Sequence, residues 1–175
     1  LEIDGESMQV HDEDAARALF AKLEQPKSRE DFIAAANYLL ALEGSNGKLG
    51  VVGFCYGGAI SSFLATRMPQ VIAAAPFYGG APATEDVPNI KAEMLVVLAG
   101  EDERVNAGWP AYEQALKATG VRYPLLQPPG TQHGFNNDTT PRYAKAAAAE
   151  AWKQTVALFN PTLRSDVMEP AKPKG

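Results

Sequence analysis

Cysteine and histidine are scarce in this chain, which has one cysteine and two histidines among 175 residues. A single cysteine cannot form an internal disulfide, and so few thiol and imidazole groups provide no metal-ligand cluster of zinc-like spacing. No apolar run is long enough to span a membrane, and no positively charged start followed by an apolar segment marks a signal peptide. The composition is therefore typical of a globular domain that needs neither a disulfide nor a metal ion.

Blocks of like charge are also lacking. The 16 Lys and Arg residues are mixed with 21 Asp and Glu residues, for a formal net charge of -5. This mixture argues against a nucleic-acid or polybasic membrane surface, so we expect neither partner. We expect a cytoplasmic protein by default. Because the chain begins at Leu1 rather than Met, an upstream targeting segment stays open.

The length and the 46% apolar content suit one globular domain. Short apolar runs alternate with stretches of helical spacing, which predicts an α/β fold whose parallel sheet carries helices on both faces. The predicted strands cover residues 49–53, 71–77, 94–99 and 121–127, and the predicted helices cover 12–24, 28–42, 56–68, 108–119 and 140–159. We assign residues 1–160 to the domain and 161–175 to a flexible, Pro-containing tail.

Two of these helices carry local signals that the structure can check. Ser28 and Asp31 resemble a capping box at the start of one helix. Pro141 fits the first turn of the last helix, where a missing N–H does no harm. The stripe that we expect to face the core from residues 28–42 consists of Phe32, Ile33, Ala36, Leu39 and Leu40.

The single cysteine lies in Gly53-Phe54-Cys55-Tyr56-Gly57-Gly58, directly after a predicted strand. The glycines two places before and after Cys55 allow a sharp strand-to-helix turn that holds one side chain strained and exposed. The N–H groups and dipole of a helix beginning near Tyr56 would favour a thiolate and a neighbouring oxyanion. The pattern predicts a nucleophile elbow, and the alternative is a small buried thiol beside a tight turn.

Later strands are followed by the groups that could activate this thiol. Residues 100–103 contain three acidic side chains, and His133 lies in the loop after the strand at 121–127. In an open parallel sheet, catalytic groups gather at the carboxyl ends of the strands. The chain order of nucleophile, acid and histidine is that of α/β-hydrolases, so we expect His133 to be the base. The other histidine, His11, is expected to be an exposed surface residue.

The identity of the acid is less constrained by the sequence. Glu101, Asp102 and Glu103 compete, and such a cluster is by default a solvated loop. We favour Asp102, because its short side chain has few rotamers and the preceding glycine allows a turn toward His133. Asp138 is the fallback.

These residues resemble the dienelactone hydrolase (carboxymethylenebutenolidase) family of α/β-hydrolases. The resemblance rests on the hexapeptide at 53–58, on Ala99-Gly100-Glu101-Asp102 and on Gly130-Thr131-Gln132-His133-Gly134-Phe135, and it extends over about residues 12–159. It implies hydrolysis of a small-molecule lactone or ester through a thioester at Cys55, with no organic cofactor and no metal. It also implies that His133 and Asp102 complete a triad and that the backbone N–H of Tyr56 is an oxyanion donor.

The chain departs from the family pattern in two places. The family has further strands before the segment that opens this chain, so we expect a carboxy-terminal portion that lacks the N-terminal strands and has a companion N-terminal segment of the same protein as partner. Without those strands an apolar sheet edge would be exposed. Family members also place an Arg four residues after the histidine, where this chain has Asn137. Asn137 is therefore a candidate substrate-binding residue for a substrate other than dienelactone.

Three other functions fit parts of the sequence. A non-catalytic remnant or interaction module could keep the elbow because it packs well. Redox sensing by Cys55 lacks a resolving cysteine. Dinucleotide binding needs a glycine spacing that Gly50, Gly53, Gly57 and Gly58 do not provide.

Overall fold

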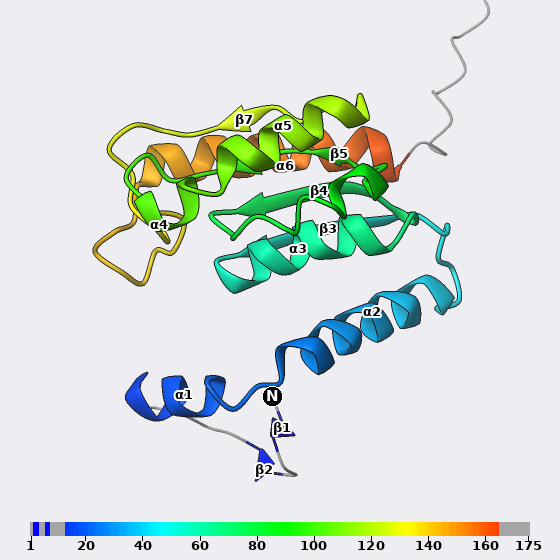
Figure 1. Ribbon diagram of the computed structural model, residues 1–175, viewed down its shortest axis with the longest axis horizontal. Helices are drawn as coiled ribbons and strands as arrows, with labels where there is room; N and C mark the ends of the chain where they lie inside the picture. The colour runs from blue at the N-terminus through cyan, green and yellow to red at the C-terminus, as the bar shows by residue number, and fades with distance from the viewer. Residues whose placement is uncertain (1, 4–5, 8–12, 165–175) are drawn as a thin grey trace, which may run out of the picture.

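The computed structural model of the chain describes residues 2–3, 6–7 and 13–164 (Figure 1). A parallel sheet runs through its centre in the order β3-β4-β6-β7, and β5 also pairs with β4. Its strands are β3 (Leu49–Phe54), β4 (Val71–Phe77), β5 (Glu93–Met94), β6 (Val96–Val97) and β7 (Leu125–Leu126). The other elements are α1 (Glu13–Phe20), α2 (Gln25–Ala41), α3 (Tyr56–Arg67), the 3-10 helix η1 (Val87–Asn89), α4 (Glu103–Asn106), α5 (Trp109–Thr119), α6 (Lys145–Leu163), and the antiparallel pair β1 (Glu2–Ile3) and β2 (Glu6–Ser7).

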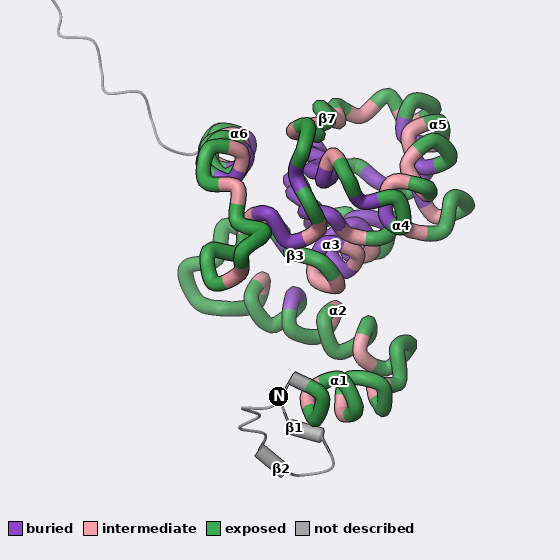
Figure 2. The backbone as a smooth tube through the Cα atoms, turned by 90° about the vertical axis from the view of Figure 1, so that its left-hand side faces the viewer, coloured by how far each residue is buried: buried purple, intermediate pink, exposed green. Residues whose placement is uncertain are grey.

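Helices cover both faces of the sheet, as the alternation in the sequence predicts. Figure 2 shows α6 on one side of the strands and α3 with α5 on the other. Two separate clusters of buried side chains reflect these layers, one including α3 and α5 and the other including α6. The chain therefore has an α/β fold, a parallel sheet with helices on both faces, as the sequence predicts.

Strand β4 is the centre of this core. Its Ala73, Ala74 and Ala75 are fully buried, because helices pack on both faces and strands pair on both sides. The small side chains let α3 and α6 approach the sheet closely, and a continuous apolar run of this kind is typical of a strand covered on both faces. The predicted bounds of this strand, 71–77, are those of the structure.

Helix α2 differs from its prediction at its start. It begins at Gln25 with Pro26 in its first turn, so the proposed capping box of Ser28 and Asp31 is wrong. A proline is tolerated there because the first N–H groups of a helix have no intrahelical acceptor. The Ser28 hydroxyl instead lies 3.1 Å from the Tyr56 hydroxyl of α3.

The predicted stripe of α2 is only half buried. Ala36 is buried, and Ile33 and Leu40 pack against the core, but Phe32 and Leu39 are 40% and 53% exposed. Figure 1 shows the reason: α2 lies outside the sheet and has α3 on one side only. A single neighbouring helix covers a narrower face than the five positions of the stripe occupy.

The last helix is shifted along the chain. Helix α6 begins at Lys145, because residues 140–144 form a turn in which Tyr143 N–H donates to Thr140 and Ala144 N–H donates to Phe135. Pro141 therefore precedes the helix instead of occupying its first turn. The helix continues to Leu163, past the predicted domain end at 160. Residues 165–175 of the predicted tail and His11 lie outside the described residues.

Two predicted strands are shorter in the structure. The strand predicted at 94–99 is divided into β5 and β6, and the strand predicted at 121–127 is reduced to β7.

Strand β3 forms an edge of the sheet and has a pairing partner on one side only within the described residues. Its Val52 and Phe54 are both 38% exposed, and on α6 Trp152 and Val156 are 50% and 39% exposed. These two pairs belong to one region, since Leu163 on the same stripe of α6 lies against Gly50 of β3. We call the four residues the β3-edge patch. The expected exposed apolar edge is present.

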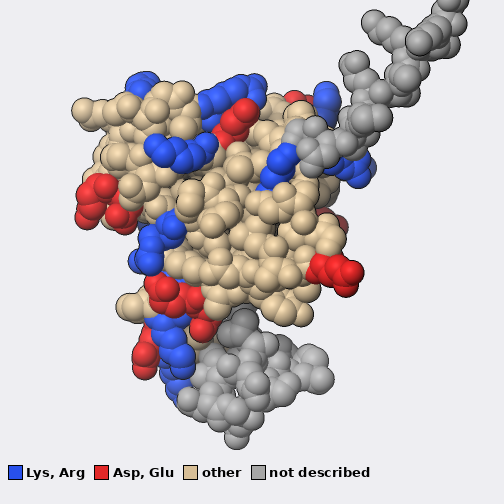
Figure 3. Space-filling model, turned by 90° about the vertical axis from the view of Figure 1, so that its right-hand side faces the viewer, with Lys and Arg blue, Asp and Glu red and all other residues tan. Residues whose placement is uncertain are grey.

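Charged side chains do not gather on the face drawn in Figure 3, where basic and acidic groups are interspersed with neutral surface. Among the described residues, no helix combines the length and the hydropathy needed to cross a membrane.

Candidate active site

Cys55 occupies the junction between β3 and α3 with a backbone φ of 53°. Non-glycine residues rarely adopt such an angle, and the surrounding structure must hold it. Cys55 N–H donates to Phe77 O at 3.1 Å, and Cys55 O accepts from Gly58 and Ala59 N–H at 3.0 and 3.2 Å. The elbow is therefore tied to the end of β4 and to the first turn of α3, and the predicted strained turn is present.

Two glycines make room for this turn. A Cβ on Gly53 would lie 2.0 Å from Gly57 O, and a Cβ on Gly58 would lie 2.4 Å from Phe77 O. Gly57 itself has open space where a Cβ would be. The sequence argument named Gly53 and Gly57 as the pair that allows the turn, whereas the close approaches occur at Gly53 and Gly58.

The thiol lies in a hydrogen-bonded line with the predicted histidine and acid. Cys55 Sγ is 3.0 Å from His133 Nε2, and His133 Nδ1 is 2.5 Å from Asp102 Oδ2. The three side chains come from the elbow, the loop after β7 and the residue before α4, which follow strand ends. Nδ1 carries the proton that Asp102 accepts, so Nε2 is free to accept the thiol proton.

Asp102 is fixed by a second contact. It caps the N-terminus of α4, where its Oδ1 accepts from Val105 N–H at 3.3 Å, and the residue is 8% exposed. A capped, buried carboxylate has little rotamer freedom, so it holds the imidazole in one orientation.

The other acid candidates lie elsewhere. Glu101 is exposed and pairs through its backbone with Gln132, while Glu103 is the exposed first residue of α4. Asp138 is exposed and makes no described hydrogen bond to His133. The geometry thus selects Asp102.

The side chain of Asn137, the candidate substrate-binding residue, forms hydrogen bonds within its own loop. Its Oδ1 accepts from Thr139 N–H at 3.0 Å and from Thr139 Oγ1 at 2.7 Å. This local turn leaves only its amide NH2 group to contact a substrate, so a role in binding stays a prediction.

The electrostatics of the thiol differ from the expectation. Burial raises the pKa of Cys55 above its ordinary value, and Asp102 adds to the rise, while the positive charges of Arg142 and Arg104 lower it. Desolvation disfavours the charged thiolate. The helix N-terminus predicted a pKa shift that favours the thiolate, whereas burial shifts the pKa of the Cys55 thiol in the opposite direction.

Arg142 and Tyr78 are two neighbours that the sequence analysis did not place in the site. The Arg142 guanidinium packs over Gly134, beside His133, at 3.8–3.9 Å from where a glycine Cβ would be. Tyr78 follows β4 directly and has a φ of 35°. The position of Tyr78 directly after a strand is the sequence signal that could have found it, because the same strand-end rule found Cys55, Asp102 and His133.

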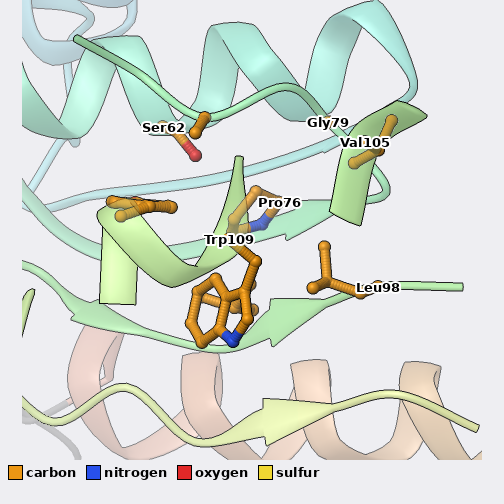
Figure 4. Close-up of a pocket in the computed structure, with 9 residues that line it drawn as sticks. Ser62, Pro76, Gly79, Leu98, Val105 and Trp109 are labelled. Atoms are coloured by element: carbon orange, nitrogen blue, oxygen red, sulfur yellow. The ribbon is translucent and has the colours of Figure 1, made fainter. Parts of the chain in front are cut away.

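A small cavity in the described part of the chain is separate from the thiol. It lies between α3, the sheet and α5, with Ser62, Pro76 and Trp109 around it (Figure 4), and its volume of about 10 Å³ has room for about one water molecule. A substrate does not fit there. Cys55 itself is exposed, at the end of the sheet where the strands β3 and β4 finish.

Nothing in the described part of the chain gathers three His, Cys, Asp or Glu side chains around a common point where a metal ion could bind.

Comparison with known proteins gives this geometry its context. The sequence model described as "Dienelactone hydrolase family" matches residues 4–163. The chain belongs to the dienelactone hydrolase family. Among its relatives, "Protein usf" of Aquifex pyrophilus is 36% identical over 138 residues, which cover 76% of this chain and 57% of that protein. A Synechocystis protein named "Putative carboxymethylenebutenolidase" is 34% identical over 128 residues, covering 67% and 52%.

Solved structures share the fold. A dienelactone hydrolase from Anabaena variabilis is 25% identical with a TM-score of 0.60, covering 78% of this chain and 60% of that one. A dienelactone hydrolase-like promiscuous phosphotriesterase from metagenomic libraries is 22% identical with a TM-score of 0.73, covering 91% and 71%. The chain spans about half the length of the curated relatives that it matches.

Proposed function

We propose that this member of the dienelactone hydrolase family cleaves small carboxylic esters or lactones through a thioester at Cys55. The observation that carries the proposal is the line from Cys55 Sγ through the two nitrogens of His133 to Asp102 Oδ2, with steps of 3.0 and 2.5 Å. An acid that orients a histidine, and a histidine within reach of a strained nucleophile, form the arrangement that acyl transfer requires.

The first half of the reaction forms the thioester. His133 Nε2 takes the thiol proton while Sγ attacks the carbonyl carbon, and the carbonyl oxygen becomes an oxyanion. The backbone N–H of Tyr56 lies in the first turn of α3 and has no intrahelical acceptor, so it is available to stabilise that charge. The intermediate then collapses, the C–O bond breaks, and the imidazolium returns its proton to the leaving oxygen.

The second half regenerates the thiol. His133 Nε2 takes a proton from water, the water oxygen attacks the thioester carbon, and a second oxyanion forms at the same position. Collapse breaks the C–S bond, and the imidazolium protonates Sγ as the acid leaves. Because burial raises the thiol pKa, the protonated thiol is a good resting form and His133 acts as a base in both halves.

Turnover of a short-chain p-nitrophenyl ester tests this proposal. Cys55→Ala and Cys55→Ser are expected to lose turnover while melting near the wild-type temperature, since both exchanges are small and Cys55 is exposed. Ser61→Ala is a suitable control that alters a hydroxyl on the same helix. Unchanged turnover in Cys55→Ala would refute the proposal.

We also propose a partner for the β3 edge. The β3-edge patch and the unpaired side of β3 are suited to a further strand, because an apolar, unpaired edge is a surface that proteins usually cover. A companion N-terminal segment of the same protein is the occupant that we favour, and the half-length match to the curated relatives supports it.

A further inference from the structure

Tyr78 is the second described non-glycine residue with a positive φ, at 35°, and it shares this feature with Cys55 alone. Unlike Cys55, it is 2% exposed. A buried aromatic residue in this backbone region is held there against its own preference, and such strain clusters at functional sites. Its N–H donates to Val97 O, so the strained turn is fixed to β6.

The strained backbone directs the Tyr78 ring against the imidazole. The ring centroids of Tyr78 and His133 are 5.1 Å apart with planes inclined by 56°, and Tyr78 also makes T-shaped contacts with Phe77 and Phe135. A cation within about 6 Å of an aromatic centroid is attracted by the ring. His133 becomes such a cation in each half of the proposed reaction.

Among the described residues, three neighbours contact different parts of the His133 imidazole. Asp102 holds Nδ1, Cys55 lies at Nε2, and the Tyr78 ring lies against the imidazole ring. The other charged groups that act on the Cys55 thiol are Arg142 and Arg104, both of which lower its pKa.

We propose that Tyr78 is a positioning residue that holds the His133 imidazole between Cys55 and Asp102 and stabilises its protonated form through the adjacent aromatic ring. The role rests on the proposed function, and the phenol oxygen is not needed for it. Burial, with a smaller contribution from Cys55, raises the pKa of Tyr78 to about 12, so the hydroxyl stays protonated in the working pH range.

The decisive experiment is an NMR titration of the His133 ring, assigned with His133→Gln, because it reads the contact without requiring turnover. Tyr78→Leu removes the ring but keeps the same backbone demand, and its midpoint is expected to fall by about half a pH unit or more. Tyr78→Phe keeps the ring and is expected to restore the wild-type midpoint. Phe135→Leu, which opens the same cluster without touching the imidazole, is the matched control.

A wild-type midpoint in Tyr78→Leu, or an equal shift in Phe135→Leu, would overturn the proposal. Tyr78→Met takes the place of Tyr78→Leu if the latter does not fold. In kinetics, Tyr78→Leu should lower kcat about threefold to thirtyfold with KM unchanged. If the turnover of the wild-type protein did not depend on Cys55, the proposed function would be refuted. The NMR titration would still test whether the Tyr78 ring stabilises the protonated imidazole.

Discussion

Exchanging Asp102 for Asn separates the two tasks of this side chain. The carboxylate caps α4 through Oδ1 and orients His133 through Oδ2. Asn keeps an oxygen for Val105 N–H but presents an NH2 group to Nδ1. The imidazole must then carry its proton on Nε2, where it can no longer accept the thiol proton. In the serine-protease template this exchange lowers kcat about 10⁴-fold, and we expect a loss of about 10³- to 10⁴-fold here.

The effect on stability should be much smaller. Asn retains the cap and one hydrogen bond to the imidazole, so we expect a loss below about 1.5 kcal/mol. Asp102→Ala loses the cap, which costs about 1 kcal/mol, and leaves the partly buried His133 N–H without its acceptor, for a total of about 3 kcal/mol. Urea unfolding followed by tryptophan fluorescence measures both values, because Trp109 and Trp152 lie on separate helices.

Glu103→Gln is the control, since it neutralises the adjacent exposed acid outside the hydrogen-bonded line. The reasoning is refuted if Asp102→Asn keeps activity within tenfold of wild type. It is also refuted if activity falls in proportion to stability in the Asn and Ala variants, because the loss would then reflect the fold alone.

Three further predictions concern the elbow, the charge beside it and the sheet edge. Gly53→Ala should destabilise the fold by about 3 kcal/mol or more, because its Cβ would lie 2.0 Å from Gly57 O, while Gly57→Ala has open space and should unfold at an unchanged or higher urea concentration. Arg142→Gln should raise the pKa of the Cys55 thiol further and slow its alkylation by iodoacetamide at pH 8, whereas Lys117→Gln on α5 should not; equal rates would remove Arg142 from the site. Intact mass spectrometry of the protein isolated from its source should find a longer chain or a companion fragment, and a single well-folded monomer of 18.7 kDa would contradict the companion-segment proposal.

Local sequence signals were sufficient for the centre of the fold. The apolar run at 71–77 is buried on both faces, so its limits coincide with those of β4. The elbow was predictable because a cysteine directly after a short apolar strand and before a glycine-rich helix start has few structural alternatives. The strand-end rule then placed Asp102 and His133 beside it, although they are 47 and 78 residues farther along the chain.

Features that depend on neighbouring elements were not predictable in the same way. Ser28 has the sequence pattern of a helix cap, but α2 begins earlier, with Pro26 in its first turn. The Ser28 hydroxyl instead forms a hydrogen bond with the Tyr56 hydroxyl of α3. The raised pKa of the Cys55 thiol depends on burial in the folded chain and on the charges of Arg142, Asp102 and Arg104, which are distant in sequence. The positive φ of Tyr78 goes with a hydrogen bond to Val97 of β6, and only the place of Tyr78 after β4 is visible in the sequence.

The acyl-enzyme is the most direct test of the central claim. Because Cys55 is the only cysteine, rapid acid quenching of the protein with a p-nitrophenyl ester, followed by digestion and mass spectrometry, locates the acyl group without ambiguity. The account predicts one acyl group on the peptide that contains Cys55, formed within the first turnover and absent from Cys55→Ala. Turnover with no acyl group on Cys55, or with the acyl group on another residue, would contradict it.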